Sequence, residues 1–375
     1  MAGCCSSCVV TDQPSQTSSS GLLYPERDRT VSRWAAVLAG GSGTRFWPLS
    51  TGAKPKQMLS LSGDAPLLVQ TADRLAGLVP PERVLIVTGK SLLTETRRLL
   101  PHIPPENVLA EPRAASTAPA LAWATSVAQQ QDAEAAVLSL HADWYVGDDA
   151  QFRKTAALAL DVAERHDVLV TVGVKPTRPE TGYGYIIPGD VLEGEARHVK
   201  EFIEKPDAQR AVQLVQSGAL WNSGLFAWTA RRFLDETLAV AHELAPHVEM
   251  LVGGEVEQFF TTVTPVAVDV SHFERSRHVA CVPGRYPWDD VGTWAALGRV
   301  RREDESGNVL VGDVFQRGAR GCVVWADHGT IVLDGVADLV VVNANGVTLV
   351  TTKAGAADLK QLLGDLPIKI RRLTE

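Results

Sequence analysis

Short apolar runs alternate with longer amphipathic segments along most of this chain. An apolar run of roughly four to eight residues between turn residues indicates a buried strand, whereas apolar residues at helical spacing indicate an amphipathic helix. The expected strands are 34–39, 83–88, 108–110, 136–140, 168–173 and 220–229. The expected helices are 66–78, 92–100, 118–130 and 149–166. Because strands alternate with helices, we predict an α/β fold with a doubly wound, mainly parallel sheet.

The pattern changes from about residue 307, where short apolar strands and turns follow one another without a helix signal until 356–363. Such repeated short strands predict a small β-helix-like or β-roll unit with its own core. Residues 11–30 are rich in Ser, Thr, Gln and Pro, which is typical of a disordered segment. We therefore expect a disordered leader over 1–30, a catalytic domain over 31–300 and a small β-helix-like domain over 301–375.

Composition narrows the functional classes. The chain has 36 Lys and Arg against 44 Asp and Glu, a net charge of -8, which argues against nucleic acid as a partner. No apolar run reaches the roughly 18 residues that a membrane span needs, and the first thirty residues lack the pattern of a secretion signal. The cysteines are read as reduced thiols rather than as a disulfide framework or a zinc site. These features predict a cytoplasmic protein that does not bind a membrane.

The first strand is followed at once by a glycine-rich loop, the sequence GGSGT. Its members are Gly40, Gly41, Ser42, Gly43 and Thr44. Glycines permit left-handed backbone and remove side chains, so successive N–H groups can converge on an anion. Arg45, Lys54 and Lys56 follow within a few residues and add positive charge. Backbone donors combined with nearby cations predict a phosphate site.

Spacing separates this loop from two other phosphate-binding motifs. A GxGxxG fingerprint beginning at Gly41 would need glycine at 46, where the chain has Phe46, and the strand 83–88 lacks a following acidic residue. A Walker A loop would need Gly-Lys-Ser/Thr four residues after a first glycine, and that pattern is missing. A glycine-rich turn without a ligand is the remaining alternative, and the cations behind the loop argue against it.

The run GGSGTRFWPLS at 40–50, followed by KPKQ at 54–57, resembles the signature of the sugar-1-phosphate nucleotidyltransferases. The segments FWPLS at 46–50 and PKQ at 55–57 are most similar to those of the mannose-1-phosphate guanylyltransferases. The resemblance continues through TGYGYI at 181–186, FIEKP at 202–206 and WDDVGTW at 288–294, and it covers residues 33–373. The resemblance implies a Rossmann-like domain with a C-terminal β-helical fragment. It also implies transfer of the guanylyl group from GTP to mannose 1-phosphate, and it is consistent with a homodimer.

The resemblance also assigns nucleotide-binding roles. Arg45 would hold the pyrophosphate leaving group and Lys56 the α-phosphate. The segment 111–120, EPRAASTAPA, would contact the base through Pro112, Thr117 and Ala118. Ser116 departs from the family, which usually has Asn at that position. An N-cap role for Ser116 or Thr117 at the following helix explains Thr117 equally well.

A divalent metal is expected between two carboxylates. Asp143 comes just after the strand 136–140, and Mg²⁺ prefers one or two carboxylates together with phosphate oxygens. The resemblance assigns Asp143 to catalysis and to the metal, and it assigns Asp290 as the second metal ligand, with Asp289 at a position where the family varies. Trp144 stands where the family usually has His. The alternative for Asp143 is a helix cap.

The same resemblance assigns binding of the sugar phosphate to four residues. Gly184 would let the hexose approach the backbone, Glu204 would accept from sugar hydroxyls, Lys205 would meet the sugar phosphate, and Asn222 would contact the sugar. A surface ion pair is the alternative for Glu204 and Lys205. Two other functions stay open: a nucleotidyltransferase for another hexose 1-phosphate or NTP, and a weakly catalytic homologue that senses nucleotide sugars.

Overall fold

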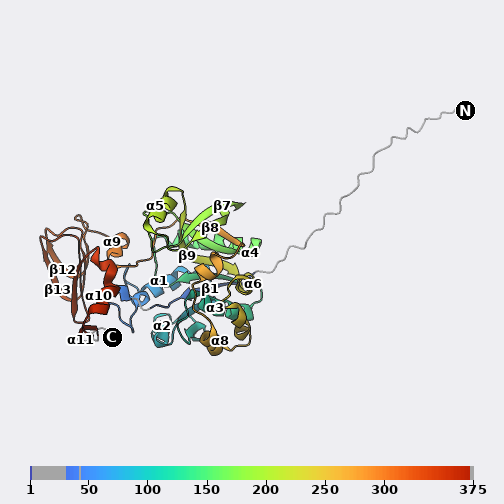
Figure 1. Cartoon of the computed structure of the whole chain (residues 1–375), viewed down its shortest axis with the longest axis horizontal. Helices are drawn as coiled ribbons and strands as arrows, with labels where there is room; N and C mark the ends of the chain where they lie inside the picture. The colour runs from blue at the N-terminus through green and yellow to red at the C-terminus, as the bar shows by residue number, and fades with distance from the viewer. Residues whose placement is uncertain (2–30, 42–43, 372–375) are drawn as a thin grey trace. The chain divides into compact units, whose positions relative to one another are not determined.

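A nine-stranded sheet forms the centre of the computed structural model, which describes Met1, residues 31–41 and residues 44–371 (Figure 1). The strand order is β3-β2-β1-β4-β9-β6-β10-β8-β7. The strands are β1 Arg33–Leu38, β2 Val84–Gly89, β3 Val108–Glu111, β4 Ala136–His141, β6 Leu169–Val174, β7 Tyr185–Glu193, β8 Ala196–Ile203, β9 Leu220–Thr229 and β10 Val279–Gly284. All six strands expected from the apolar runs are present within this sheet.

The sheet is mixed, which corrects the prediction of a mainly parallel one. Strands β3, β2, β1 and β4 pair in parallel, and so do β6 and β10. Strand β9 lies between β4 and β6 and is antiparallel to both, and β8 is antiparallel to β10 and β7. An apolar run indicates that a strand is buried but carries no information about its direction, so the pattern could not show that β9 is reversed.

Helices cover both faces of the sheet, as a doubly wound fold requires (Figure 1). The longer helices are α1 Leu67–Arg74, α2 Leu93–Leu99, α3 Thr117–Gln131, α4 Asp149–His166, α5 Ala208–Gln216 and α6 Ala230–Val240. Helices α1 and α4 pack with Ala35 and Val37 of β1, whereas α3 and α6 pack with Trp34 and Ala36. This alternation follows from the two-residue period of a strand.

Helix bounds agree with the expectations except at α1 and near the C-terminus, where a 3-10 turn precedes α10 and the helix begins later than the expected 356–363. The pattern at 66–78 predicted a longer helix, but α1 ends at Arg74 and the chain turns through Gly77, whose φ is 81°. Helix α4 has the predicted bounds, with the Asp148 side chain accepting from the Gln151 N–H at its start and Asp167 in left-handed backbone at its end. Five shorter helices are α7 Val248–Val252, α8 Val256–Thr262, α9 Leu297–Val300, α10 Leu359–Asp365 and α11 Ile368–Arg371.

The C-terminal residues form a separate four-stranded sheet. Its strands are β12 Val309–Arg317, β13 Val323–Asp334, β14 Leu339–Ala344 and β15 Val347–Thr352. Strands β12, β13 and β14 pair in parallel through short connections, but β14 and β15 form an antiparallel hairpin, so this sheet is also mixed. Trp294 links it to the rest of the chain, because its ring contacts Phe46 at 5.1 Å and Trp325 at 5.9 Å. Among the helices that the structure describes, none is both long and apolar enough to span a membrane.

Candidate active site

A cavity of about 350 Å³ lies where β1, β3 and β4 end. It is lined by Leu38, Gly40, Gly41, Val87, Glu111, Ala114, Ala115, Ser116, Thr117, Ala120, His141 and Asp143. The structure therefore brings Gly40, Gly41, Thr117 and Asp143 together, although they are far apart in sequence. The carboxyl ends of parallel strands are where α/β sheets bind ligands, and a cavity of this size suits a small molecule.

The other predicted nucleotide residues have different surroundings. Ser42 and Gly43 lie outside the described residues, and Thr44 begins a 3-10 turn that contains Arg45. Ala118 is fully buried, and its N–H donates to the Val266 carbonyl at 3.1 Å. Pro112 is half-buried directly after Glu111. Neither Pro112 nor Ala118 lines the cavity.

Ser116 occupies the N-cap position of α3, but neither Ser116 nor Thr117 caps the helix through its side chain. Ser116 has a φ of 68° and its side chain caps no helix N–H. The Thr117 hydroxyl accepts from the Val268 N–H at 2.8 Å, across 151 residues, and so fixes a distant loop rather than its own helix. The segment 111–120 is therefore held open along the cavity by a long-range contact.

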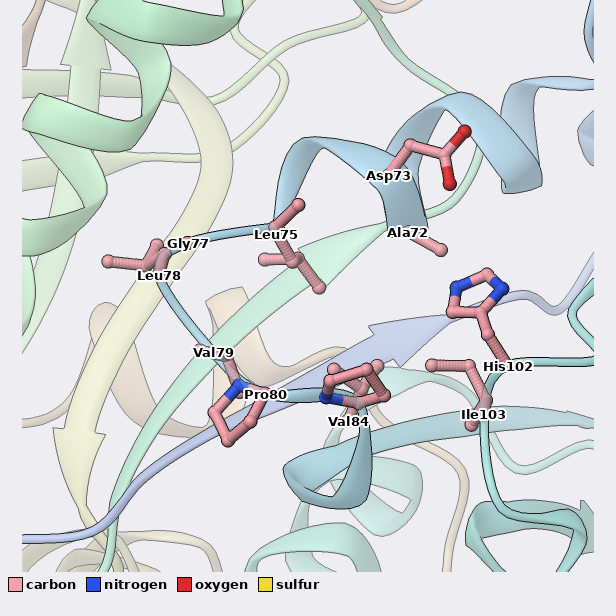
Figure 2. A pocket seen from close by; sticks show the side chains of 12 residues that line it. Ala72, Asp73, Leu75, Gly77, Leu78, Val79, Pro80, Val84, His102 and Ile103 are labelled. Atoms are coloured by element: carbon pink, nitrogen blue, oxygen red, sulfur yellow. The ribbon is translucent and has the colours of Figure 1, made fainter.

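A larger cavity, of about 540 Å³, lies at the opposite ends of the strands (Figure 2). Its wall includes Leu75, Val79 and Val84, and the exposed residues Asp73 and His102 also line it (Figure 2). Val84 is the first residue of β2, so this cavity is at the amino end of a parallel strand. It shares no lining residue with the glycine-loop cavity. Size alone therefore does not identify the ligand site here.

Lys56 joins two loops that are far apart in sequence. Its ammonium donates to Asp143 Oδ2 at 3.0 Å and to the backbone carbonyl of Asp290, and its side chain is only 6% exposed. Burial would raise the pKa of Asp143, but Lys56, His141 and Arg45 outweigh it and hold that pKa below its usual value. Asp143 is thus an ionised carboxylate beside a fixed cation. It does not cap a helix, since Asp148 caps α4.

A small β-ribbon brings Asp290 to this place. Strand β5, Tyr145–Val146, pairs antiparallel with β11, Trp288–Asp289, so the loops after β4 and after β10 lie together. Asp290 Oδ1 accepts from the Tyr183 hydroxyl at 2.5 Å and from the Gly292 N–H at 3.2 Å. A Cβ at Gly292 would lie 2.6 Å from Asp290 Oδ2 and 3.3 Å from Arg45 Nη1. A side chain at position 292 would therefore push this carboxylate and Arg45 from their observed positions.

The neighbouring carboxylate, Asp289, has a different environment. It is only 5% exposed, and Arg299 binds it through two N–H groups at 2.6 and 3.0 Å. Its Oδ1 also accepts from the Val291 N–H at 2.9 Å. The charge of Asp289 is thus compensated by protein, whereas Asp290 Oδ2 has no hydrogen bond to any residue that the structure describes. This difference supports Asp290 over Asp289 as the metal carboxylate.

The fit to a metal rests on two carboxylates. Within the described residues, no group of three or more His, Cys, Asp or Glu side chains is arranged to hold a metal ion. Asp143 and Asp290 are linked through Lys56, and both present carboxylate oxygen. Mg²⁺ takes oxygen ligands, keeps several waters and needs only one or two protein carboxylates when phosphate is present. The residues present therefore fit Mg²⁺ bound together with a triphosphate.

Three predicted sugar residues lie together. A Cβ at Gly184 would lie 2.6 Å from Glu204 Oε2 and 3.3 Å from Asn222 Cβ, so any side chain there would displace the Glu204 carboxylate. The Glu204 pKa is raised, mainly by burial and further by Asp269, although Lys205 opposes the rise. Lys205 pairs with Glu204 in this structure and is 64% exposed, so the predicted ion pair is present.

Sequence reasoning missed the partner of Asn222. The Asn222 carbonyl accepts from the Thr171 hydroxyl at 3.0 Å and from the Gly224 N–H at 3.1 Å. Its amide donates to Asp269 Oδ1 at 2.7 Å. Asn222 is therefore engaged within the protein and orients Asp269, which follows in sequence only after 47 residues. Asp269 belongs to the run VDVSHFERS at 268–276, whose carboxylates carry no recognisable motif in sequence.

Glu111 was also missed. It is the last residue of β3 and lines the cavity, and its Oε2 lies 3.9 Å from the position of a Cβ at Gly40. Burial raises its pKa to about 7. It has no ion pair among the described residues, so its carboxylate is available to a ligand. Its place at the end of a predicted strand was the one available signal.

Trp144 is part of the core rather than of the cavity. It is 5% exposed and contacts Trp288 and His141, with ring centroids 6.1 and 5.3 Å away. A Cβ at Gly224 would lie 3.0 Å from its ring. The residue that departs from the family pattern therefore packs against Trp288 of the β5–β11 ribbon and is not among the residues that line the cavity.

Comparison with known proteins identifies the family of this chain. Residues 34–307 match the family model described as nucleotidyl transferase. Mannose-1-phosphate guanylyltransferases of Salmonella typhimurium and Escherichia coli are each 34% identical, over 87% and 88% of this chain and 71% and 72% of theirs. A Thermus thermophilus structure described as a mannose-1-phosphate geranyltransferase is 36% identical, with a TM-score of 0.84, covering 89% of this chain and 99% of that one. The chain therefore belongs to the nucleotidyl transferase family and, within it, to the mannose-1-phosphate guanylyltransferases.

Proposed function

We propose that this chain transfers the guanylyl group of GTP to α-D-mannose 1-phosphate, forming GDP-mannose and releasing pyrophosphate. The observation that carries the proposal is the convergence of Arg45, Lys56, Asp143 and Asp290 at the edge of the glycine-loop cavity. Two cations and two carboxylates from distant segments are the groups that phosphoryl-type transfer needs for positioning and charge stabilisation.

The reaction needs no covalent nucleophile. An oxygen of the sugar phosphate attacks the α-phosphorus of GTP, and the bond from that phosphorus to the bridging oxygen of the β-phosphate breaks. A phosphate monoester is largely a dianion near neutral pH, with a second pKa of about 6, so no general base is required. Arg45 and the backbone of the glycine loop hold the leaving pyrophosphate. Lys56 holds the α-phosphate.

Asp143 and Asp290 would hold Mg²⁺ together with oxygens of the triphosphate. When bound, the ion neutralises part of the phosphate charge that two anionic substrates bring into one cleft. The protein contributes fixed orientation: Lys56 positions Asp143, and Tyr183 with the Gly292 N–H positions Asp290. Tyr183 is a positioning residue, and burial raises its pKa, so it stays a donor across the physiological range.

Glu111 would select guanine. Guanine carries two neighbouring donors, the N1–H and the 2-amino group, and an ionised carboxylate accepts from both. Adenine has no 2-amino group and an unprotonated N1. Because burial raises the pKa of Glu111 to about 7, the binding-competent anion is only partly populated at neutral pH in the free protein. GTP binding is therefore expected to weaken as the pH falls below about 7.

The sugar would bind beside Gly184, with its hydroxyls donating to Glu204 and to Asp269, which Asn222 orients. Lys205 would have to exchange its contact with Glu204 for the sugar phosphate. Its 64% exposure and its position next to Glu204 support that exchange, because the ammonium is free to rotate toward solvent.

We also propose assignments for the C-terminal unit, the oligomeric state and the cellular location. The parallel winding of β12, β13 and β14 supports a β-helix-like C-terminal unit beginning near residue 301, and the exposed pair Phe315 and Val332 on it is compatible with a homodimer contact. A cytoplasmic location is supported by Cys281 and Cys322, which are buried free thiols. A disordered leader over 1–30 stays a prediction, since those residues are outside the described range apart from Met1.

The test is nucleotide-sugar formation over a matrix of NTPs and hexose 1-phosphates, followed by chromatography. We expect GTP with mannose 1-phosphate to give the highest kcat/KM. If another NTP and hexose 1-phosphate gave the highest kcat/KM, the chain would be a nucleotidyltransferase with a different substrate pair. Binding of GDP-mannose without turnover of any pair would instead support the sensing homologue.

A further inference from the structure

A third cavity, of about 430 Å³, lies next to the loop that carries Asp290 but on the other face of the sheet from the sugar site. Its wall includes Trp221, whereas Asn222 faces the sugar site, and successive strand residues point to opposite faces. The cavity shares no lining residue with the glycine-loop cavity. Neither proposed substrate needs it.

Its lining is strongly cationic. Four basic side chains, Lys175, Arg178, Arg285 and Arg299, meet a single carboxylate, Asp289. Lys175, Arg285 and Arg299 are exposed at the rim, whereas Trp221 and Asp289 are buried beneath them. Arg178 pairs with Glu180 at 3.2 Å and Arg285 pairs with Glu195. Lys175 has no ion pair within the part of the chain that the structure describes, so it leaves the lining with a net positive charge. A concave site with cations at its rim favours an anionic ligand, and phosphate groups suit arginine in particular.

Arg178 connects this cavity to Asp290. Its guanidinium lies over the Trp221 ring, 5.1 Å from the centroid, and its Nη2 donates to the Tyr183 hydroxyl at 3.2 Å. That hydroxyl in turn donates to Asp290 Oδ1 at 2.5 Å. Two hydrogen bonds therefore separate a cationic lining residue from the proposed metal carboxylate.

Arg299 supplies a second connection. It binds both oxygens of Asp289, and Asp289 Oδ1 accepts from the Val291 N–H in the backbone directly after Asp290. Val291 has a φ of 47°, an unusual value for a β-branched residue, so the loop depends on its surrounding contacts. An anion that competes with Asp289 for Arg299 would weaken one of these contacts.

We propose that this cavity binds a phosphate-bearing anion and that its occupancy lowers activity. The bound anion draws Arg178 and Arg299 away from Tyr183 and Asp289, which loosens the loop that positions Asp290. The size of the cavity admits a ligand larger than inorganic phosphate, such as a sugar phosphate or a nucleotide. The inhibitory effect rests on the proposed function, whereas binding of the anion does not.

The test uses the full-length wild type and the double variant Lys175→Ala/Arg285→Ala. These two residues line the rim and touch neither Asp290 nor Tyr183, so the rate without added anion is expected to stay within about twofold. A matched control, Lys200→Ala/Lys360→Ala, removes two exposed positive charges elsewhere. GDP-mannose formation is followed chromatographically while inorganic phosphate, GMP or glucose 6-phosphate is added at constant ionic strength.

We expect at least one of these anions to inhibit the wild type and the control without competing with GTP or mannose 1-phosphate, and to inhibit the double variant at least tenfold more weakly. Which anion acts most strongly identifies the source of the phosphate group. Purely competitive inhibition, equal inhibition of all three proteins, or no inhibition would overturn the proposal.

Calorimetry of the same anions separates this inference from the proposed function. If the wild type makes no GDP-mannose, the proposed function fails, but a binding event that the double variant loses and the control keeps would still support the site. Identical binding isotherms for the wild type and the double variant would contradict it.

Discussion

The nucleotide half and the sugar half of this sheet use different chemistry. Around the glycine loop, the proposed nucleotide site offers small residues, backbone and two cations, Arg45 and Lys56. Around Gly184, the proposed sugar site offers Glu204 and also Asp269, which the Asn222 amide holds. Phosphate oxygens need donors and positive charge, whereas sugar hydroxyls need acceptors, so the two halves suit the two ends of a nucleotide sugar.

The boundary between the two halves is formed by three charged residues, Lys56, Asp143 and Asp290. Lys56 contacts the Asp143 carboxylate on one side and the Asp290 backbone carbonyl on the other, so it links the loop after β4 to the loop after β10, which the β5–β11 ribbon also joins. Substitutions at this boundary should therefore lower the rate of the chemical step. Changes within either half should affect mainly the substrate bound there.

The largest effect is expected from the cations. Arg45→Ala and Lys56→Ala should each lower kcat by about a hundredfold or more, since each removes positive charge directed at phosphate in the transition state. Lys54→Ala is the matched control, because Lys54 is exposed two residues before Lys56 and should cost less than about threefold. Steady-state rates with saturating substrates check this. Near wild-type turnover in either active-site variant would refute the assignment.

The metal carboxylates should come next. Asp143→Asn and Asp290→Asn are each expected to lower kcat at least about tenfold and to raise the Mg²⁺ concentration needed for half-maximal rate. Chelator should abolish wild-type activity and added Mg²⁺ should restore it. Full activity in chelator would exclude a metal from the mechanism.

Asp289→Asn provides the comparison within the same loop. It should lower kcat much less than Asp290→Asn, but it should reduce the free energy of unfolding, because it leaves buried contacts to Arg299 without their charge. Denaturant unfolding and kinetics on the same samples measure both. An equal loss of kcat in Asp289→Asn and Asp290→Asn would contradict the assignment of the metal to Asp290 rather than Asp289.

Within the sugar half, Asp269→Asn should raise the KM for mannose 1-phosphate by about tenfold and leave the KM for GTP within about twofold, because a carboxylate acceptor becomes a mixed donor and acceptor. Asp235→Asn, at an exposed carboxylate on α6, is the control. If Asp269→Asn changed both KM values equally, the separation between the two halves would be lost.

The smallest effect is expected at the base. Glu111→Gln should lower the preference for GTP over ATP by about threefold to tenfold, with ITP, which lacks the 2-amino group, much less affected than GTP. In the wild type, protonation of Glu111 should weaken GTP binding as the pH falls from about 7 to 5.5, because its pKa is raised to about 7. The variant should lose that pH dependence. An unchanged GTP to ITP ratio in the variant would assign guanine selection elsewhere.

The sequence was informative wherever the chemistry is local. The glycine loop, Arg45 and Lys56 lie within 17 consecutive positions, 40–56, and strand ends marked Asp143, so periodicity and motif could be combined. The Gly184, Glu204 and Asn222 grouping came from resemblance alone, and the structure places the three together.

What escaped prediction depends on tertiary pairing. The reversed strand β9 brings Asn222 beside Thr171 and Asp269, and no spacing rule relates residues 51 and 47 positions apart. Tyr183 reaches Asp290 across 107 residues through the β5–β11 ribbon, and each strand of that ribbon has only two residues, too short for a pattern to show. Glu111 acquires its raised pKa from burial, which a sequence does not display.

The most direct measurement is a crystal structure of the chain with GDP-mannose and Mg²⁺. We expect guanine against Glu111, the hexose beside Gly184 and Glu204, and the ion between Asp143 and Asp290, with Asp289 still bound to Arg299. A nucleotide sugar bound outside these two half-sites, or an ion coordinated by Asp289 in place of Asp290, would contradict it.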